Sequence, residues 1–512
     1  MGAECEERLI TLIRKRIGIR ILDHQLNNLR TTYADACQRF HFSDCNEYCE
    51  QLEQSSNDSQ QQEHLVAGIT VGESYFFRDS GQIALLSEEI LPKLITSRRQ
   101  QGHYSLRIWS AGCSDGQELY SIAILLDQLI PERERPQWKI HLLGTDINVE
   151  ALSRAIGGHY REWSFRATSE QIREQYFTTE LNPNGHRMWR LADTVRQKAR
   201  FSYLNLYSDS FPSILSETSS MDLILCRNVF IYFDLPTVTE VMRKFYLSLN
   251  DGGILMMGPT DLVDRSAHRG FTILGDDEAH FLRKETADPP PQQRPPSRQQ
   301  RPTTPLQTTT TAATPRSRME DPQQKLQQRL PPALRPYSAI ILLLGNEAWG
   351  DALKEVETHL HQGDNSVLVW QFLAKALANM GRTHDALEAC SKSIQQDPSD
   401  KHVHFIQSLL LIEANRFQAA EDALRRTIFL DRHFVEAHYH LGLLLIRLGR
   451  NQAGIKSLNN ALEIALSAAP DRRLHDAGAM NYGRLATILS HEIKMYQSFD
   501  RPLESTHRGR YS

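Results

Sequence analysis

A repeat of 34 residues near the end of the chain places the strongest constraint on its fold. Trp370, His404 and His438 are separated by this interval, and further sets of positions keep the same spacing. These sets are Leu377, Leu411 and Leu445, then Gly381, Asn415 and Gly449, and finally Ala386, Ala420 and Gly454. Such a period, with small residues at regular positions, predicts stacked helix pairs that bury a core between neighbouring units.

This period resembles the tetratricopeptide repeat, in which each unit is a pair of helices. We predict an all-α repeat domain over residues 337–496, with clear units at about 367–468 and a tail at 497–512. Residues 337–360 resemble a degenerate preceding pair, and residues 472–496 a capping helix. Repeats of this kind present a concave surface, so we expect a protein or peptide partner; the alternative is a scaffold for self-association.

A proline-rich segment separates the repeats from the rest of the chain. Twelve of the 22 prolines lie between residues 288 and 336, among Gln, Thr, Ser and Arg. A segment with so few apolar residues cannot offset its ordering entropy by burial, which predicts a disordered linker. The 512 residues also exceed what one hydrophobic core normally serves, so more than one domain is expected.

The part before the linker changes its pattern along the chain. Residues 1–65 carry apolar residues at three- and four-residue intervals, which predicts a helical subdomain. Residues 66–287 then alternate predicted strands with predicted helices, which indicates an α/β fold with a doubly wound, mostly parallel sheet. The strands are expected at 106–111, 140–145, 221–227 and 253–258, and the helices at 116–130, 149–156 and 237–249. Residues 160–201 break the alternation, which predicts a small inserted subdomain.

Composition limits the location and the partners of the chain. The net charge of -4 gives no reason to expect nucleic acid as a partner. No apolar run approaches the roughly 18 residues that a membrane helix needs, and residues 1–20 are too charged for a secretory signal, so we expect a cytoplasmic protein without membrane insertion. Cys37, Cys45 and Cys49 lack a second ligand pair at matching spacing, so we expect reduced thiols and no metal site.

The segment Ser110–Leu126 carries the first indication of chemistry. A predicted strand runs into a turn containing Gly112 and Gly116 and then into a helix, with Glu118 in its first turn. Such a turn brings backbone N–H groups to the sheet edge where nucleotide-like ligands bind, although it can also be a simple tight connection. Asp146 ends the next predicted strand, where an acid commonly accepts hydrogen bonds from ribose hydroxyls; alternatively, it caps the helix that follows.

Five short motifs together resemble one family. They are SAGCSDGQELYSIA at 110–123, GTDIN at 144–148, CRNVFIYF at 226–233, SYFFRD at 74–79 and YLNL at 203–206. In this order they are similar to the chemotaxis receptor methyltransferases (CheR-type) over about residues 5–285. The resemblance implies a Rossmann-like fold and S-adenosylmethionine as methyl donor. It also implies transfer to glutamate carboxylates on the cytoplasmic domain of a methyl-accepting chemoreceptor, in chemosensory signal transduction; some members carry similar repeats.

The resemblance also implies a set of site residues. Arg78 and Tyr232 would lie near the transferred methyl group and the incoming glutamate. The cofactor contacts would be Ser74, Arg78, Glu118, Asp146, Asn205, Leu206, Arg227 and Asn228. The chain departs from the family pattern at several positions: Gly72 replaces a usual asparagine, Asp115 a threonine, Gln117 and Leu119 a glutamate and a proline, and GPTD at 258–261 replaces GHSE.

The expected reaction is a direct displacement. A glutamate with an ordinary pKa of about 4.3 is already ionised near neutral pH, so no general base is required. Catalysis then depends on alignment of the reacting atoms in a site that excludes water. The linker and repeats would take no part in this chemistry, so a chain ending near Glu285 should retain methyl transfer.

Two other functions fit parts of the sequence. Residues 112–116 satisfy the G-x-S-x-G pattern of serine hydrolases, with Ser114 as nucleophile and His268 or His280 as the available histidine. The chain could instead be a non-enzymatic signalling adaptor in which the repeats act and the front domain is vestigial. Loss of activity in Ser114→Ala would favour the hydrolase, whereas retained charged site residues favour the methyltransferase over the adaptor.

Overall fold

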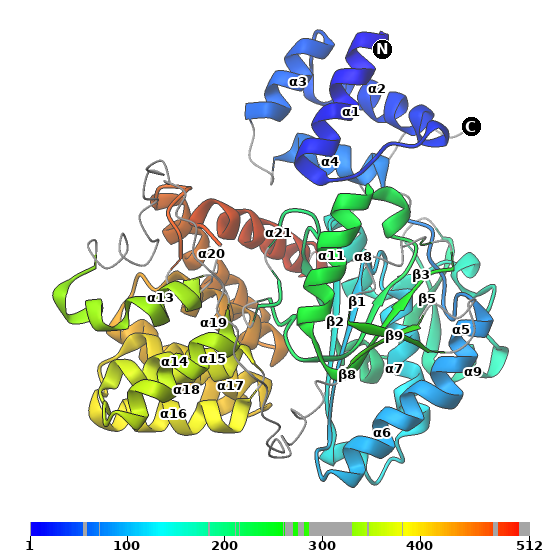
Figure 1. The fold of residues 1–512 in the computed structure, drawn as a ribbon. Helices are drawn as coiled ribbons and strands as arrows, with labels where there is room; N and C mark the ends of the chain where they lie inside the picture. The colour runs from blue at the N-terminus through cyan, green and yellow to red at the C-terminus, as the bar shows by residue number, and fades with distance from the viewer. Residues whose placement is uncertain are drawn as a thin grey trace, which may run out of the picture.

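The structure is a computed structural model that places three regions relative to one another. It describes residues 2–54, 59–70, 72–182, 185–209, 211–213, 216–259, 261, 270–274, 281–285, 330–345, 348–380, 382–474 and 480–500. A helical N-terminal region lies above a sheet-containing domain, and the helical repeats lie beside that domain (Figure 1). Expected linker residues 288–329 and tail residues 501–512 lie outside the described ranges. Among the described residues, no helix is long and apolar enough to span a bilayer.

The N-terminal region is helical, as its apolar periodicity predicts. Its elements are α1 (Ala3–Ile17), η1 (Asp23–Gln25), α2 (Leu26–Phe40), α3 (Cys45–Gln54) and α4 (Gln60–Ile69). Leu9, Leu12, Ile13 and Ile17 form the buried stripe of α1, because their spacing places them on one side of the helix. These residues belong to the same hydrophobic cluster as one face of the central sheet, so the helices pack onto the sheet domain.

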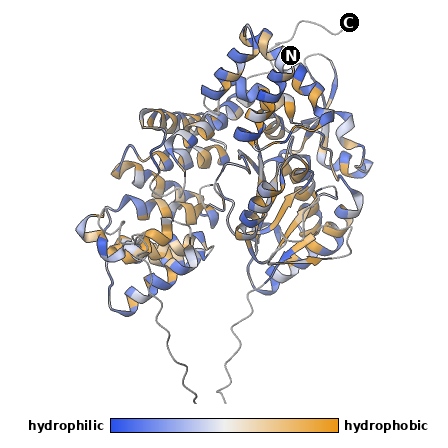
Figure 2. Ribbon diagram, turned by 45° about the horizontal axis from the view of Figure 1, so that its top comes forward, coloured by the Kyte–Doolittle hydropathy of each residue, from blue (hydrophilic) through white to orange (hydrophobic). Residues whose placement is uncertain are grey.

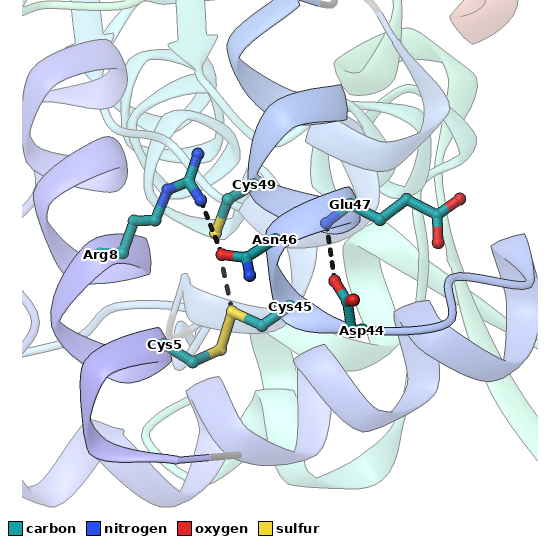
Figure 3. The surroundings of a disulfide bond; sticks show 7 residues. All are labelled: Cys5, Arg8, Asp44, Cys45, Asn46, Glu47 and Cys49. Carbon is teal, nitrogen blue, oxygen red and sulfur yellow. Dashed lines mark hydrogen bonds between the residues drawn. A yellow bond between two sulfur atoms is a disulfide. The ribbon is translucent and has the colours of Figure 1, made fainter.

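The cysteines of this region differ from the expectation of reduced thiols. Cys5 of α1 and Cys45 of α3 form a disulfide with a Cα–Cα distance of 5.9 Å (Figure 3). The buried thiol of Cys49 lies 3.8 Å from the Cys45 sulfur. Beside the bond, Arg8 of α1 donates to the side chain of Asn46 at 2.9 Å (Figure 3). The covalent bond and the hydrogen bond therefore join the same two helices.

The central domain contains a seven-stranded sheet in the order β6-β2-β1-β7-β8-β10-β9. Strands β6, β2, β1, β7 and β8 are parallel, whereas β10 and β9 are antiparallel, which confirms the predicted α/β class with a mostly parallel sheet. The strands are β1 (Ser105–Ala111), β2 (Lys139–Asp146), β6 (Ala199–Tyr203), β7 (Met221–Cys226), β8 (Leu249–Met257), β9 (Phe271–Leu274) and β10 (Phe281–Lys284). The accompanying helices are α5 (Ser80–Leu85), η2 (Leu86–Ile90), α6 (Leu91–Gln100), α7 (Gln117–Leu129), η3 (Arg135–Gln137), α8 (Val149–Gly157), η5 (Phe230–Tyr232) and α11 (Leu235–Ser248).

Alternate residues of the buried strands belong to two separate hydrophobic clusters. In β7, Leu223 and Leu225 join the cluster that contains α7, whereas Ile224 and Cys226 join the cluster that contains α11. Successive side chains of a strand point to opposite faces, so the sheet is covered by helices on both sides. Figure 2 shows the hydrophobic residues (orange) concentrated on these strands and on the inner sides of the helices.

The inserted region forms a second, three-stranded antiparallel sheet in the order β3-β5-β4. Its elements are β3 (His159–Tyr160), η4 (Glu162–Phe165), α9 (Glu170–Tyr176), β4 (Phe177–Leu181), β5 (Arg187–Leu191) and α10 (Asp193–Arg196). The turn between β4 and β5 is closed by the Gly185 N–H, which donates to the Asn182 carbonyl at 2.9 Å. Residues 199–201, which we expected in the insertion, belong instead to β6 of the main sheet.

The repeats form consecutive helix pairs with the predicted period. After η7 (Pro332–Tyr337) come α13 (Ser338–Gly345), α14 (Trp349–His361), α15 (Val367–Asn379), α16 (Thr383–Gln396), α17 (Lys401–Glu413), α18 (Phe417–Leu430), α19 (Val435–Arg447), α20 (Asn451–Ser467) and α21 (Tyr482–Asp500). The first helices of the three clear units begin at Val367, Lys401 and Val435, which keeps the 34-residue spacing. Two expected boundaries shift, because residues 332–336 are helical rather than linker and residues 497–500 belong to α21 rather than to the tail.

Helix α21 leaves the repeats and covers the β6 edge of the sheet domain, where it also contacts α8 (Figure 1). Ser202 of β6 donates to Glu492 of α21 at 2.6 Å, and the rings of Tyr203 and His491 lie 4.4 Å apart. An exposed edge strand is a template for unwanted pairing, and an adjoining helix is one of the means by which proteins cover it. The repeat domain therefore covers one edge of the sheet through its helix α21.

Candidate active site

The predicted site residues converge at the carboxyl ends of four neighbouring strands. Strand order β6-β2-β1-β7 brings together the segments that follow Tyr203, Asp146, Ala111 and Cys226. The chain leaves β1 toward β2 on one side, while β7 lies on the other, so the sheet order reverses beside β1. Ligands of open α/β sheets bind at such a switch point, outside the carboxyl ends of the strands.

The turn after β1 needs its glycines. Gly112 and Gly116 have φ angles of 80° and 83°, which are left-handed values that favour glycine. A Cβ on Gly116 would lie 2.9 Å from both Ala155 and the Phe201 ring, so a side chain would also collide with α8 and β6. Ser114 in the same turn has a φ of 49°, an uncommon value for a residue with a side chain. The turn is therefore held in one conformation by its surroundings.

Asp146 holds this turn against the end of β2. One carboxylate oxygen accepts from the Ser114 N–H at 2.8 Å, and the other accepts from the Asn148 N–H at 2.8 Å. Burial raises the pKa of Asp146, and these backbone hydrogen bonds oppose the rise. The cap of α8 is Asn148, whose side chain accepts from the Ala151 N–H, so Asp146 is not the helix cap considered from the sequence. Asp146 instead links two neighbouring strand ends.

Glu118 and Arg227 form a buried charged pair beneath the turn. Glu118 accepts from the Ser110 hydroxyl at 2.7 Å, and its other oxygen lies 3.2 Å from the Arg227 guanidinium. Arg227 also donates to Gln82 at 2.9 Å and forms an ion pair with Asp79. Its side chain is 3% exposed, so Arg227 binds carboxylates of its own chain rather than standing open to a cofactor carboxylate. Sequence reasoning missed Asp79 and Gln82, although Asp79 directly follows Arg78 in the SYFFRD motif.

Arg78 lies on a loop whose backbone is unusual on both sides. Phe77 and Asp79 have φ angles of 56° and 61°. Left-handed values in residues with bulky side chains are rare and cluster at functional sites. Arg78 donates to the Glu73 carbonyl at 2.8 Å. Burial raises the pKa of Tyr232 in η5, and the nearby positive charge of Arg78 acts against that rise, so the two predicted catalytic residues are neighbours.

Asn228 and Asn205 begin the loops after β7 and β6. The Asn228 N–H donates to Asp261 at 2.6 Å, and Asp261 also accepts from the Gly258 N–H at 2.9 Å. Asp261, where the family pattern has glutamate, is 1% exposed and orders the loop that carries Asn228. The Asn205 N–H donates to Asp209 at 2.7 Å. Asn205 and Leu206 are buried, at 4% and 6% exposure, beside the end of β2.

One pocket collects most of these groups. Its walls include Ser74, Arg78, Glu118, Arg227 and Asn228, together with Gly112 and Ser114 of the turn. Asp146, Asn205, Leu206 and Tyr232 do not line this pocket. The first three lie at the adjoining strand ends, and Tyr232 lies in η5. The pocket therefore combines carboxylate, guanidinium, amide and hydroxyl groups on a rigid frame.

These groups fit S-adenosylmethionine, which carries ribose hydroxyls, an ammonium group, a carboxylate and a sulfonium. Among the described residues, the buried side-chain oxygens of Ser114 and Gln117 have no hydrogen-bond partner. Buried polar atoms are normally satisfied, so orphaned oxygens beside a glycine-rich turn indicate space for a polar ligand. Carboxylates suit hydroxyl and ammonium donors, and the turn at the start of α7 suits a ligand that approaches the backbone.

The geometry around Ser114 does not favour a hydrolase. Its hydroxyl is buried and, within the described ranges, makes no hydrogen bond, whereas an activated serine needs a base within reach. His268 and His280, the histidines considered from the sequence, lie outside the described residues.

Comparison with known proteins identifies two families along the chain. Residues 72–279 match the family described as CheR methyltransferase, SAM binding domain, and residues 407–472 match a tetratricopeptide repeat family. A chemotaxis protein methyltransferase of Borreliella burgdorferi is 30% identical over 50% of this chain and 87% of its own length. A probable chemotaxis protein methyltransferase of Rhizobium etli is 34% identical over 45% of this chain and 81% of its own length.

A third relative, the chemotaxis protein methyltransferase of Salmonella typhimurium, is 30% identical over 52% of this chain and 88% of its own length. Among solved structures, one titled "Crystal structure of MamA" aligns to 30% of this chain and 94% of its own, at 20% identity and a TM-score of 0.23, too low to support an argument. The family matches cover the sheet domain and most of each relative, and they do not favour the adaptor or the hydrolase. The chain therefore belongs to the CheR family of chemotaxis methyltransferases, enzymes that use S-adenosylmethionine as methyl donor.

Proposed function

We propose that this chain transfers a methyl group to glutamate carboxylates on the cytoplasmic domain of a methyl-accepting chemoreceptor, and thereby acts in chemosensory signalling. The names of its relatives support a chemoreceptor substrate. The observation that carries the choice of a carboxylate is the place of Arg78 in the pocket wall, within electrostatic reach of the Tyr232 hydroxyl, which does not itself line the pocket. A guanidinium and a neutral phenol are both donors, and a carboxylate accepts from both.

The proposed roles follow from the chemistry of each side chain. S-adenosylmethionine, when bound, supplies an electrophilic methyl group on a positively charged sulfur. Arg78 would hold one oxygen of the incoming glutamate. Tyr232 would donate to the other oxygen, because a phenol with an ordinary pKa of about 10 is protonated at neutral pH, and burial raises the pKa of Tyr232 further. No residue needs to remove a proton, because the glutamate is ionised at its ordinary pKa of about 4.3.

The cofactor contacts divide into two groups by their surroundings. Ser74, Glu118 and Asn228 line the pocket and are proposed to contact the cofactor directly, with Arg227 behind Glu118. Asp146, Asn205 and Leu206 are proposed to receive the nucleoside part at the ends of β2 and β6. In this proposal the methyl-bearing end of the cofactor would lie near Arg78, which the transfer requires.

The decisive test is the chemical nature of the product. The full chain is incubated with a chemoreceptor signalling domain and S-adenosylmethionine labelled in its methyl group, and the labelled protein is then treated with alkali. A carboxyl methyl ester releases volatile methanol under these conditions. Label that resists alkali would mean methylation of another atom and would refute the glutamate proposal. Mass spectrometry of the receptor domain then assigns the modified residues.

Two variants separate the methyltransferase from the hydrolase in the same assay. Arg78→Ala should depress transfer strongly, because the glutamate loses a charged donor in a site that excludes water. Ser114→Ala should leave turnover at saturating cofactor nearly unchanged, because the proposed displacement does not use this hydroxyl, although its loss should weaken cofactor binding. Absence of incorporated label, together with an esterase activity that Ser114→Ala abolishes, would instead support the hydrolase.

The repeats are proposed to bind a protein or peptide partner and to bring the cytoplasmic enzyme to its substrate. Support comes from the helix pairs α15–α16, α17–α18 and α19–α20, because stacked pairs of this kind present extended binding surfaces. Receptor methylation in cells by chains with and without the repeats, at equal expression, tests this role. Equal methylation would argue for a self-association scaffold, which sedimentation of the full chain would then detect.

A further inference from the structure

A single carboxylate connects the proposed cofactor segment after β6 with the last helix of the repeat domain. One oxygen of Asp209 accepts from the Asn205 N–H at 2.7 Å and also forms an ion pair with Arg484 of α21. Asp209 is 8% exposed, so water does not replace either partner easily. The two elements that meet here are separated by almost the whole length of the linker and the repeats.

The segment itself is a turn closed by internal hydrogen bonds. The Asp209 N–H donates to the Asn205 carbonyl at 2.9 Å, and the Tyr207 N–H donates to the Asn205 side-chain oxygen at 3.0 Å. At the start of the turn, the Leu204 N–H donates to the Asp146 carbonyl at 3.1 Å. A shift of Asp209 is therefore transmitted to Asn205 and to the end of β2, where Asp146 holds the glycine-rich turn.

Arg484 is fixed against both ends of this segment. It belongs to the first turn of α21, and its guanidinium lies 5.0 Å from the centre of the Tyr203 ring, at the end of β6. Burial alone would lower the pKa of Arg484, but the negative charge of Asp209 and hydrogen bonds with Asp209 and Tyr203 outweigh it and raise the pKa. An arginine held in this way keeps the carboxylate of Asp209 in one position.

We infer that Arg484 is a positioning residue for cofactor binding, and that it acts through Asp209 on the segment 204–206. The inference rests on the proposed contact of Asn205 and Leu206 with S-adenosylmethionine. Because α21 packs on α20 of the last repeat as well as on α8 and β6, the repeat domain supplies a part of the cofactor site. The affinity for the cofactor then depends on how the last helix is seated.

The test measures S-adenosylmethionine binding to the full chain by calorimetry. Arg484→Ala should weaken binding about tenfold and raise the KM for the cofactor, with kcat at saturating cofactor nearly unchanged. Arg484→Lys, which keeps the charge, should recover part of the loss. Lys494→Ala is the matched control, because Lys494 lies on the same helix but pairs at 2.6 Å with Glu63 of α4.

A double-mutant cycle tests the route through Asp209. Arg484→Ala combined with Asp209→Asn should weaken binding no more than the stronger single change, because both break the same link. Unchanged affinity in a folded Arg484→Ala chain, or equal weakening in Lys494→Ala, would overturn the inference. Additive losses would also overturn the route through Asp209. Unchanged affinity in Asn205→Ala would instead remove the proposed cofactor contact, and a wild-type chain that binds no S-adenosylmethionine would refute the proposed function itself.

Discussion

Two arginines of the site have opposite environments, and the difference decides what each can do. Arg227 is enclosed by Glu118, Asp79 and Gln82 and is 3% exposed, whereas Arg78 lies in the wall of the pocket and is only partly covered. A buried charge that loses its partner costs far more than an exposed one. Arg227 therefore maintains the frame of the site, and Arg78 is the arginine that can meet a substrate.

This contrast predicts different losses in the two alanine variants. Arg227→Ala should lower the free energy of unfolding by about 3 kcal/mol, because the largely buried carboxylate of Glu118 is left without its cation, and Asp79 also loses its partner. Arg78→Ala should change stability by less than about 1 kcal/mol and lower turnover strongly. Urea unfolding and the methyl transfer assay measure the two effects. Equal stability of both variants would contradict the structural role of Arg227.

Asp146 gives a second prediction at this scale. Asp146→Ala should weaken S-adenosylmethionine binding by about 1–3 kcal/mol, because the Ser114 and Asn148 N–H groups lose their acceptor and the turn loosens. Burial raises the pKa of Asp146, so the folded state binds this proton more tightly than the unfolded state. The contribution of Asp146 to the free energy of unfolding then falls as the pH rises from its unfolded pKa through its raised folded pKa. Calorimetry gives the affinity, and an unchanged value would remove Asp146 from the site.

At the scale of elements, the sequence predicts those strands that are marked by a local run of apolar residues. Strands β1, β2 and β7 begin within one residue of their expected positions, because each is a buried run bounded by polar residues. Strand β8 begins four residues early, at Leu249, because Asn250 to Gly253 interrupt its apolar pattern. Strand β6 is short and alternating, and its outer edge is covered by a helix distant in sequence, so no local signal marks it.

The candidate site shows the same difference between local features, which the sequence predicts, and contacts between distant residues, which it does not. The motifs place the site residues at strand ends, because each motif is local. The partners of these residues are non-local: Asp79 and Gln82 meet Arg227, and Asp209 meets Arg484, across long stretches of chain. The pairing of Cys5 with Cys45 is equally hidden, because the two residues are 40 positions apart and no local pattern marks a disulfide between them.

Asp234 joins helix α11 to helix α1. Asp234 caps α11 by accepting from the Thr237 N–H at 3.1 Å, and it pairs with Arg14 of α1 at 2.7 Å. The hydroxyl of Thr237 and then Arg14 lower the pKa of Asp234 to about 2. Its stabilising contribution is therefore present above the ordinary pKa of about 3.9 and is lost as the pH falls toward 2.

Asp234→Ala should lower the free energy of unfolding by about 1 kcal/mol at neutral pH. The difference from the wild type should vanish near pH 2. Arg14→Ala, the matched variant, should cost less, because its side chain is 63% exposed and water screens the pair. Thermal unfolding across this pH range measures the difference, and a loss independent of pH would contradict the role of the charge.

The disulfide between α1 and α3 gives the second prediction for elements. Cys5→Ser should lower the stability of the N-terminal helices by about 2–4 kcal/mol under oxidising conditions, because the bond restricts a 40-residue loop of the unfolded chain. A reducing agent should produce the same loss in the wild type and none in the variant. Cys37→Ser, which removes a cysteine outside the bond, is the control. Hydrogen exchange of α1 and α3 follows the effect locally.

At the scale of the whole molecule, the repeats and the sheet domain share a surface. Arg107 of β1 lies 3.4 Å from Glu413 of α17, and α21 covers the outer edge of β6. Because of this contact, removal of the repeats also uncovers a part of the sheet domain. A chain that ends at Glu285 keeps the pocket residues but exposes Tyr203 and the edge of the sheet.

We therefore predict that the chain ending at Glu285 retains methyl transfer at saturating cofactor, as the sequence suggests, but unfolds at a lower temperature and binds S-adenosylmethionine more weakly than the full chain. The lost cover of β6 explains the first change, and the lost Arg484–Asp209 pair explains the second. Calorimetry and thermal unfolding of both chains provide the comparison. Identical melting temperature and affinity would mean that the two domains are energetically independent.

The cover of β6 also sets an order of events during synthesis. The ribosome completes β6 at residue 203, whereas α21 begins at residue 482. At about 5–20 residues per second, the outer edge of the sheet waits roughly 15 to 60 seconds for the helix that closes it. During that interval the nascent chain carries an open strand edge that other chains can pair with. The synthesis of α21 thus ends the period in which the edge of β6 is open to pairing with other chains.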